Sequence, residues 1–159
     1  MSDDARTVAW QLGRPPRGSW RVVVRCSCGY PVVIATAPGG DPPFPTLYYL
    51  TCPHLIGAVS SVESEGGVAR WRDAVAQDPA LAERLEAADA AYRTARAAEA
   101  GGTDPFTLAG IAGQHDVRGV KCLHAHVAAF LAGIDDPVGE GVLADVATEC
   151  DDGRCEEAV

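Results

Sequence analysis

The sequence predicts a single α+β domain in which a small three-stranded antiparallel sheet packs against four or five helices. Three observations support this prediction. The chain has 159 residues, of which 47% are hydrophobic, as expected of one domain with a substantial core. β-branched runs separated by turn residues lie in the first third of the chain. Helix-forming segments fill most of the remaining two thirds.

The first third is expected to contain one helix and three strands. Residues 3–12 predict a short helix with acidic residues in its first turn, and Gly13 ends it. The two prolines of segment 14–18 then impose a stiff turn. The proline-rich segment 38–45 is expected to be a loop. Strands are predicted at residues 20–25, 31–37 and 47–51, and successive strands pair most simply as antiparallel neighbours.

The remainder is expected to be helical, apart from one loop and a tail. Pro53 and Pro79 each stand at a first helical position, where the missing N–H costs nothing. Segment 101–116 is predicted to be a loop. Residues 1–149 would form the domain, and the acidic tail 150–159 is expected to be disordered. The predicted helices occupy residues 53–65, 68–77, 79–98, 118–133 and 137–149.

Charge is concentrated at the C-terminal end. The chain carries a net charge of -9, and from Asp135 onward there are nine acidic residues and one basic residue. Acidic protein repels phosphate backbones, so a nucleic-acid partner is not expected. No apolar run approaches the ~20 residues that cross a bilayer, and no signal peptide is visible at the acidic N-terminus. The sequence therefore predicts a cytoplasmic protein without a membrane partner.

Six cysteines are the most informative feature of the composition. In a reducing compartment they are explained by metal binding, thiol chemistry or simple burial rather than by disulfides. Three segments carry sulfur, two of them with imidazole: Cys26-Ser27-Cys28, Cys52-Pro53-His54, and segment 121–126, which contains Cys122, His124 and His126.

Two of these segments are expected to meet at one edge of the sheet. The strands before Cys26 and Cys52 each run antiparallel to the middle strand, so they run parallel to each other and end at the same edge. In the predicted helix 118–133, Cys122 and His126 are four residues apart and share one flank, whereas His124 falls on the opposite flank.

The sequence thus predicts a metal site built from Cys26, Cys52 and Cys122, with His126 or Cys28 completing it. Three thiolates and an imidazole are a common zinc set, and three cysteines would also hold an iron–sulfur cluster with one open iron. A closed zinc site would be structural, and an open position could activate water or substrate. Whether the protein is an enzyme stays open.

Other interpretations of these residues remain. Cysteine is often simply buried. A small thiol enzyme could use Cys122 or Cys52 as the nucleophile. Its base would be His126, or His54, which is predicted to lie at a helix N-terminus.

A basic patch is predicted from three arginines around the first strand. Arg14 and Arg17 flank the two prolines of a rigid turn before that strand, and Arg25 ends it. Guanidinium groups on a rigid turn would suit a small anionic ligand such as phosphate or carboxylate. The alternative is that these arginines are solvated or pair with the acidic tail.

Four strings, at residues 11–18, 25–31, 43–53 and 121–125, occur in order along the chain. With them the sequence resembles a bacterial, mainly actinobacterial, family called domain of unknown function 501. The resemblance implies no settled activity. It does imply gene neighbours that encode a septum-formation initiator protein and an exopolyphosphatase. A non-catalytic adaptor or regulator, with a protein partner in cell division or polyphosphate metabolism, is therefore the alternative function.

Overall fold

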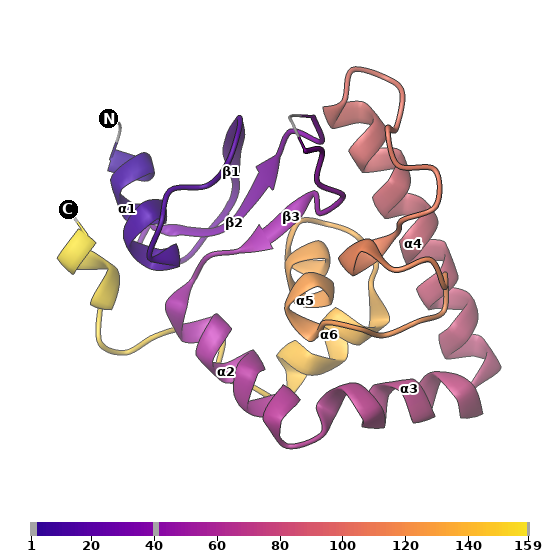
Figure 1. Ribbon diagram of the computed structural model, residues 1–159. Helices are drawn as coiled ribbons and strands as arrows, with labels where there is room; N and C mark the ends of the chain where they lie inside the picture. Colours follow the sequence, from indigo (N-terminus) through magenta and orange to yellow (C-terminus); the bar gives the residue numbers. More distant parts are fainter. Residues whose placement is uncertain (1–2, 40–41, 159) are drawn as a thin grey trace.

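The computed structural model describes residues 3–39 and 42–158 (Figure 1), so part of the predicted loop 38–45 lies outside the described residues. The three strands are β1 (Trp20–Arg25), β2 (Pro31–Thr36) and β3 (Tyr48–Leu50). They form one antiparallel sheet in the order β1-β2-β3. The predicted α+β class and sheet are confirmed.

The described part of the chain contains six α-helices. Asp78 and Asp136 cap two of them through their side chains, each accepting two backbone N–H groups. Among the described helices, none has both the length and the apolar character that a bilayer crossing requires. The helices are α1 (Asp3–Leu12), α2 (Pro53–Ser64), α3 (Gly67–Gln77), α4 (Pro79–Glu99), α5 (Leu123–Leu131) and α6 (Pro137–Ala144), with short 3-10 turns η1 (Ile111–Gly113) and η2 (Arg154–Ala158). Of these helices, α5 packs against β3 and α1 against β2.

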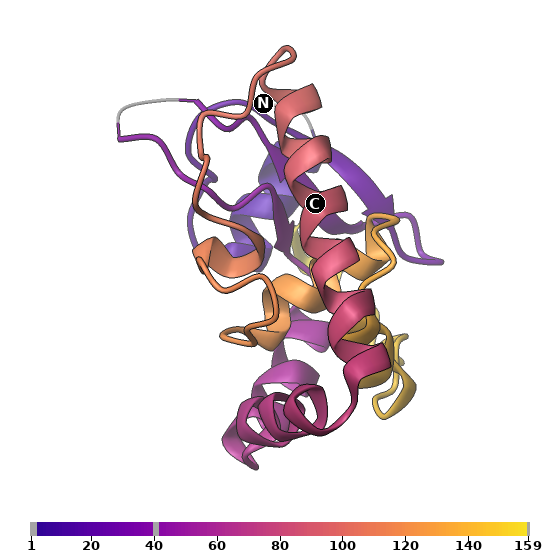
Figure 2. The same ribbon diagram turned by 90° about the vertical axis from the view of Figure 1, so that its right-hand side faces the viewer.

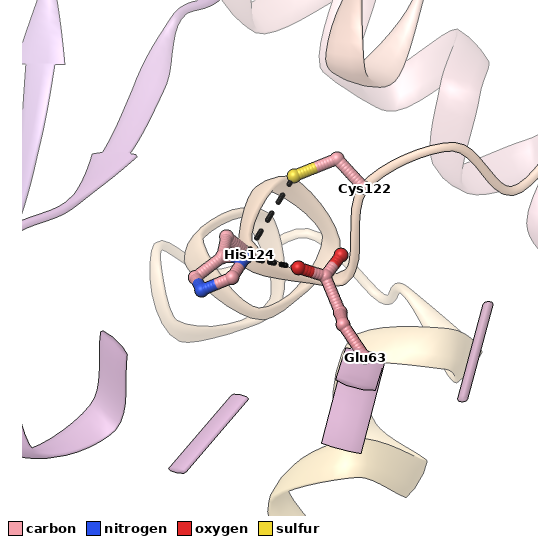
Figure 3. Close-up of side chains that lie close together, drawn as sticks. All are labelled: Glu63, Cys122 and His124. Atoms are coloured by element: carbon pink, nitrogen blue, oxygen red, sulfur yellow. Dashed lines mark hydrogen bonds and ion pairs between the residues drawn. The ribbon is translucent and has the colours of Figure 1, made fainter. Parts of the chain in front are cut away.

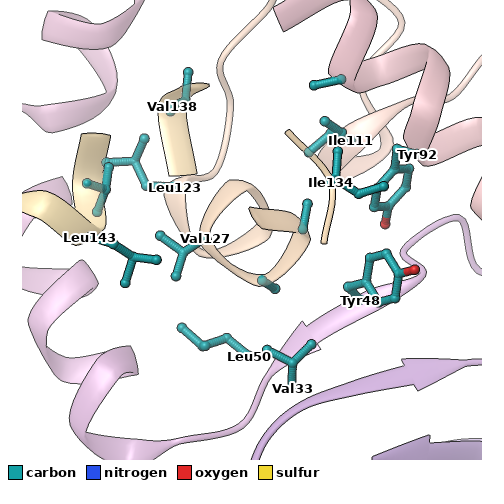
Figure 4. Close-up of a cluster of buried hydrophobic side chains, with 14 of the residues drawn as sticks. Val33, Tyr48, Leu50, Tyr92, Ile111, Leu123, Val127, Ile134, Val138 and Leu143 are labelled. Atoms are coloured by element: carbon teal, nitrogen blue, oxygen red, sulfur yellow. The ribbon is translucent and has the colours of Figure 1, made fainter. Parts of the chain in front are cut away.

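Helix α5 is the centre of the core (Figures 1 and 2). It contacts β3, α2, α6 and η1. Leu123 and Val127 of α5 are fully buried and belong to the same hydrophobic cluster as Val33 and Leu50 of the sheet (Figure 4). Burying such a side chain contributes about 1.5–3 kcal/mol, so residues on either side of Leu123 are held firmly in place.

A buried ionisable pair joins α5 to α6. His126 Nδ1–H donates to Asp136 Oδ2 over 2.6 Å, and both side chains are fully buried. Asp136 Oδ1 accepts the N–H groups of Val138 and Gly139 at the start of α6. A Cβ at Gly139 would lie 2.2 Å from the His126 carbonyl oxygen, so only glycine allows this close approach.

Helix α5 is shorter than the sequence predicts. It begins at Leu123 rather than Arg118, and Cys122 is extended, with φ -140° and ψ 114°. A side chain of α3 fixes the chain before α5: Arg72 Nε donates a hydrogen bond to the Val120 carbonyl oxygen over 2.7 Å. The apolar spacing of residues 120–134 is helical, but tertiary contacts decide where the helix starts.

The predicted mobility of the acidic tail is not confirmed. The chain is described to Ala158, and η2 lies against α1 at the edge of the molecule (Figure 1). Cys155 within η2 is buried. Helix α6 also ends at Ala144 rather than at residue 149, which releases the chain to turn back toward α1.

A fully buried arginine orders the loop after α4. The Arg96 guanidinium binds both carboxylate oxygens of Asp104 over 2.8 Å. It also donates to the carbonyl groups of Pro45, Phe106 and Ala109. These contacts tie the loop after α4 to the segment before β3.

We expect Arg96→Met to lower the free energy of unfolding by about 3–5 kcal/mol, because it leaves a carboxylate and several carbonyl groups without their donor. Arg84→Met is the control: Arg84 also pairs with two acids, Asp135 and Glu140, but is exposed, and should cost less than about 1 kcal/mol. Urea unfolding measures both. Equal losses in the two variants would contradict the assignment.

Candidate functional site

Three potential ligand side chains converge where α2 ends and α5 begins (Figure 3). Glu63 projects from the last turn of α2, Cys122 precedes α5, and His124 lies in its first turn. His124 Nδ1 is 2.9 Å from Glu63 Oε1 and 3.9 Å from Cys122 Sγ. One ligand atom from each residue fits within 4.8 Å of the others.

The backbone orients two of these side chains. His124 Nε2 lies 3.2 Å from the Ile56 carbonyl oxygen and 3.1 Å from Ser60 Oγ, and in the tautomer with its proton on Nε2 the ring donates to the carbonyl. Glu63 Oε2 accepts the Leu123 N–H over 3.0 Å, satisfying an otherwise unpaired N–H at the start of α5. Glu63 Oε1 and His124 Nδ1 are thereby turned toward Cys122.

The ionisable groups act on one another. Burial opposes ionisation of Cys122, but the His124 side chain and the Ala125 N–H outweigh it, and the pKa of the thiol is lowered. The contact with Cys122 raises the pKa of His124, and the negative charge of Glu63 adds to this rise. The side chains of His124 and Glu63 are each about a quarter exposed, at 25% and 26%, so solvent reaches the group.

This arrangement differs from the predicted partnership of Cys122 with His126. The prediction requires Cys122 to lie within the helix, whereas it stands before the helix in extended conformation. Its thiol consequently meets His124, which the helical spacing places on the opposite flank. His126 instead points into the core and binds Asp136. Sequence reasoning missed Glu63, because nothing local marks a glutamate near a helix end as a partner of residues about 60 positions away.

The other five cysteines line a separate small cavity. Its wall is made from the turn after β1, the N-terminus of α2 and the C-terminal segment. Predicted ligands Cys26, Cys28 and Cys52 are therefore brought to one cavity, whereas Cys122 and His126 do not line it. The lining residues are Cys26, Cys28, Tyr30, Pro31, Cys52, Thr148, Glu149, Cys150, Gly153 and Cys155.

Side-chain hydrogen bonds hold the C-terminal segment, residues 145–158, over this cavity. Ser27 Oγ donates to Glu149 Oε2 over 2.7 Å, and His54 Nε2 donates to the Ala147 carbonyl oxygen over 2.7 Å. Gln11 Nε2 donates to Cys155 Sγ over 3.4 Å. The catalytic role predicted for His54 stays a prediction. In the structure its Nε2–H group connects α2 to the C-terminal segment by a hydrogen bond to the Ala147 carbonyl oxygen.

The predicted anion-binding arginines are divided between two environments. Arg14 and Arg17 line a groove beside Tyr49 and Phe44, whose rings stack with centroids 6.1 Å apart. Arg25 binds both carboxylate oxygens of Asp4 over 2.9 and 2.7 Å. Anion binding by Arg14 and Arg17 stays a prediction, while the Arg25 guanidinium is occupied by Asp4.

Comparison with known proteins places the chain in a family. Residues 22–144 match the model of a family described as a protein of unknown function, DUF501. The matched range includes Glu63, Cys122 and His124 but ends before Cys150 and Cys155. Searches of curated proteins and of solved structures found no match. Because the family model covers most of the chain, the protein belongs to the DUF501 family of proteins of unknown function.

Proposed function

We propose that the protein binds a divalent metal ion, most favourably zinc, through Glu63, Cys122 and His124. Carboxylate oxygen, thiolate sulfur and imidazole nitrogen are all usual zinc ligands, and three protein ligands leave a fourth position for water. The observation that carries this proposal is the direction in which His124 Nδ1 points.

That nitrogen faces two electron-rich atoms. In the tautomer that donates its Nε2 proton to the Ile56 carbonyl, the neutral imidazole presents a lone pair at Nδ1 to Glu63 Oε1 and Cys122 Sγ. Electron pairs that face one another at such short range repel unless a proton or a cation lies between them. In the metal-free protein a proton on Nδ1 fills that place, and a metal ion would bind all three atoms at once.

The surrounding contacts resemble those that support metal ligands. Metal-binding histidines usually donate their second N–H to a carbonyl or carboxylate, which fixes the ring and its tautomer. The Ile56 carbonyl has that position here. The Leu123 N–H restrains Glu63 in the same manner.

An open position on the ion suggests chemistry rather than a purely structural role. Zinc with three protein ligands lowers the pKa of its bound water to about 7. The partial exposure of Glu63 and His124 would allow a substrate to approach that water. A metal-assisted hydrolytic reaction is therefore the reaction class that this site favours.

Zinc titration tests the site. We expect His124→Ala and Cys122→Ser each to remove one zinc equivalent, or weaken its binding more than tenfold, since loss of an outer partner alone costs about 10–100-fold. His115→Ala is the matched control, because His115 is an exposed histidine in a loop. Competition with a coloured chelator gives the affinity, and circular dichroism verifies folding. Zinc affinity and stoichiometry unchanged in both folded variants would contradict the proposal.

A thiol reaction at Cys122 is the second candidate, favoured by the lowered pKa of this thiol. In metal-free protein at neutral pH, we expect iodoacetamide to alkylate Cys122 faster than Cys52 or Cys155, whose pKa values burial raises. His124→Ala should slow the alkylation of Cys122, and peptide mass spectrometry measures the rate at each site. This candidate fails if Cys122 reacts no faster than the two buried thiols.

A further inference from the structure

We infer that the remaining five cysteines form a second metal centre, a thiolate site for zinc or an iron–sulfur cluster, which the C-terminal segment closes. This inference is independent of the proposed function, because it uses other residues at another place in the fold. Its ligands would be drawn from Cys26, Cys28, Cys52, Cys150 and Cys155.

Five cysteines from distant parts of the chain lie around one cavity. The sequence places the five cysteines in three segments that are far apart along the chain, yet all of them line one small cavity. Simple burial does not explain the group, because Cys28 is exposed and two others are only partly buried. Five of the six cysteines around one cavity indicate that sulfur itself is required there.

Thiolate ligands limit which metals the cavity would bind. Thiolates select zinc, copper(I) and iron–sulfur clusters over magnesium or calcium, which prefer oxygen ligands. Zinc and iron–sulfur clusters commonly take four cysteines, so the cavity offers one more than either needs. Among the described residues, no three of these sulfurs lie within 4.8 Å of one another, so a single zinc ion would have to draw them together, whereas the larger iron–sulfur cluster spans more widely spaced sulfurs. Cys28 is the most exposed of the five and is the one that a four-coordinate centre would leave unused.

Hydrogen bonds around the cavity fix the C-terminal segment in place. Three of them attach it to the turn after β1, to α2 and to α1: Ser27 to Glu149, His54 to the Ala147 carbonyl, and Gln11 to Cys155. An N–H that donates to a ligand sulfur, as Gln11 does, is the kind of outer contact found around metal centres.

A centre of this kind explains why an acidic, short segment is ordered. Residues 150–157 contain four acids and one arginine and bury few apolar groups, so local sequence gives them little stability. Ligation of Cys150 and Cys155 would attach the segment to Cys26 and Cys52 through the metal. Metal binding and ordering of the C-terminal end would then be one coupled process.

The test is metal analysis of the full chain purified without oxygen. We expect either one zinc equivalent beyond that bound by Glu63, Cys122 and His124, or iron with acid-labile sulfide and visible absorption. Cys150→Ser and Cys155→Ser should each remove or sharply weaken this centre. Cys122→Ser is the matched control and should leave it intact. Because His124→Ala affects only the other site, failure of one proposal is distinguishable from failure of the other.

Hydrogen exchange provides a second readout that does not depend on a variant folding. Removing the metal from wild-type protein should accelerate amide exchange in residues 146–158 at least about tenfold, while the core of α5 stays protected. The inference is overturned if folded Cys150→Ser and Cys155→Ser keep the wild-type metal content. It is also overturned if wild-type protein holds no metal beyond that lost in Cys122→Ser, or if its thiols are recovered as disulfides under anaerobic conditions.

Discussion

The hydrogen bond from the Leu123 N–H to the Glu63 carboxylate is the interaction on which the candidate site depends. It satisfies an N–H at the start of α5 with a negative charge, which the helix dipole also favours there. Leu123 itself is fully buried in the core, so the start of α5 is fixed both by packing and by this bond. Cys122 and His124 flank Leu123 and are therefore held in place with it.

Near the start of α5, buried core residues alternate with partly exposed potential metal ligands. Leu123 and Val127 point into the core, and His126 is held there by Asp136. Cys122 and His124, on either side of Leu123, stay partly exposed. The start of α5 therefore holds two potential ligands near solvent, one just before the helix and one in its first turn, which is the arrangement that a precise metal site requires.

The sheet could be predicted from the sequence, because its signals are local. The β-branched run 20–25 and the turn residues beside it specify both ends of β1, which has the predicted boundaries. The start of α5 could not be predicted in this way. Residues before Leu123 continue the helical spacing, and only contacts with Glu63 and Arg72, far away along the chain, determine where the helix begins.

The same distinction between local signals and long-range contacts explains which of the predicted site residues lie near one another. The approach of Cys26 and Cys52 follows from strand direction, and both line one cavity. The approach of Cys150 and Cys155 depends on long-range contacts such as that from Gln11 to Cys155, which acidic composition does not reveal. The structure does not bring Cys122 and His126 together, because the helical angle does not apply to a residue outside the helix.

Cadmium NMR of the cadmium-loaded protein tests whether Cys122 binds metal with Glu63 and His124 and apart from the other cysteines. The chemical shift reports how many sulfurs surround the ion, and cadmium, like zinc, accepts mixed sulfur, nitrogen and oxygen ligands. We expect a resonance typical of one sulfur ligand that is lost in Cys122→Ser and retained in Cys155→Ser. A single sulfur-rich resonance that both substitutions perturb would contradict this expectation.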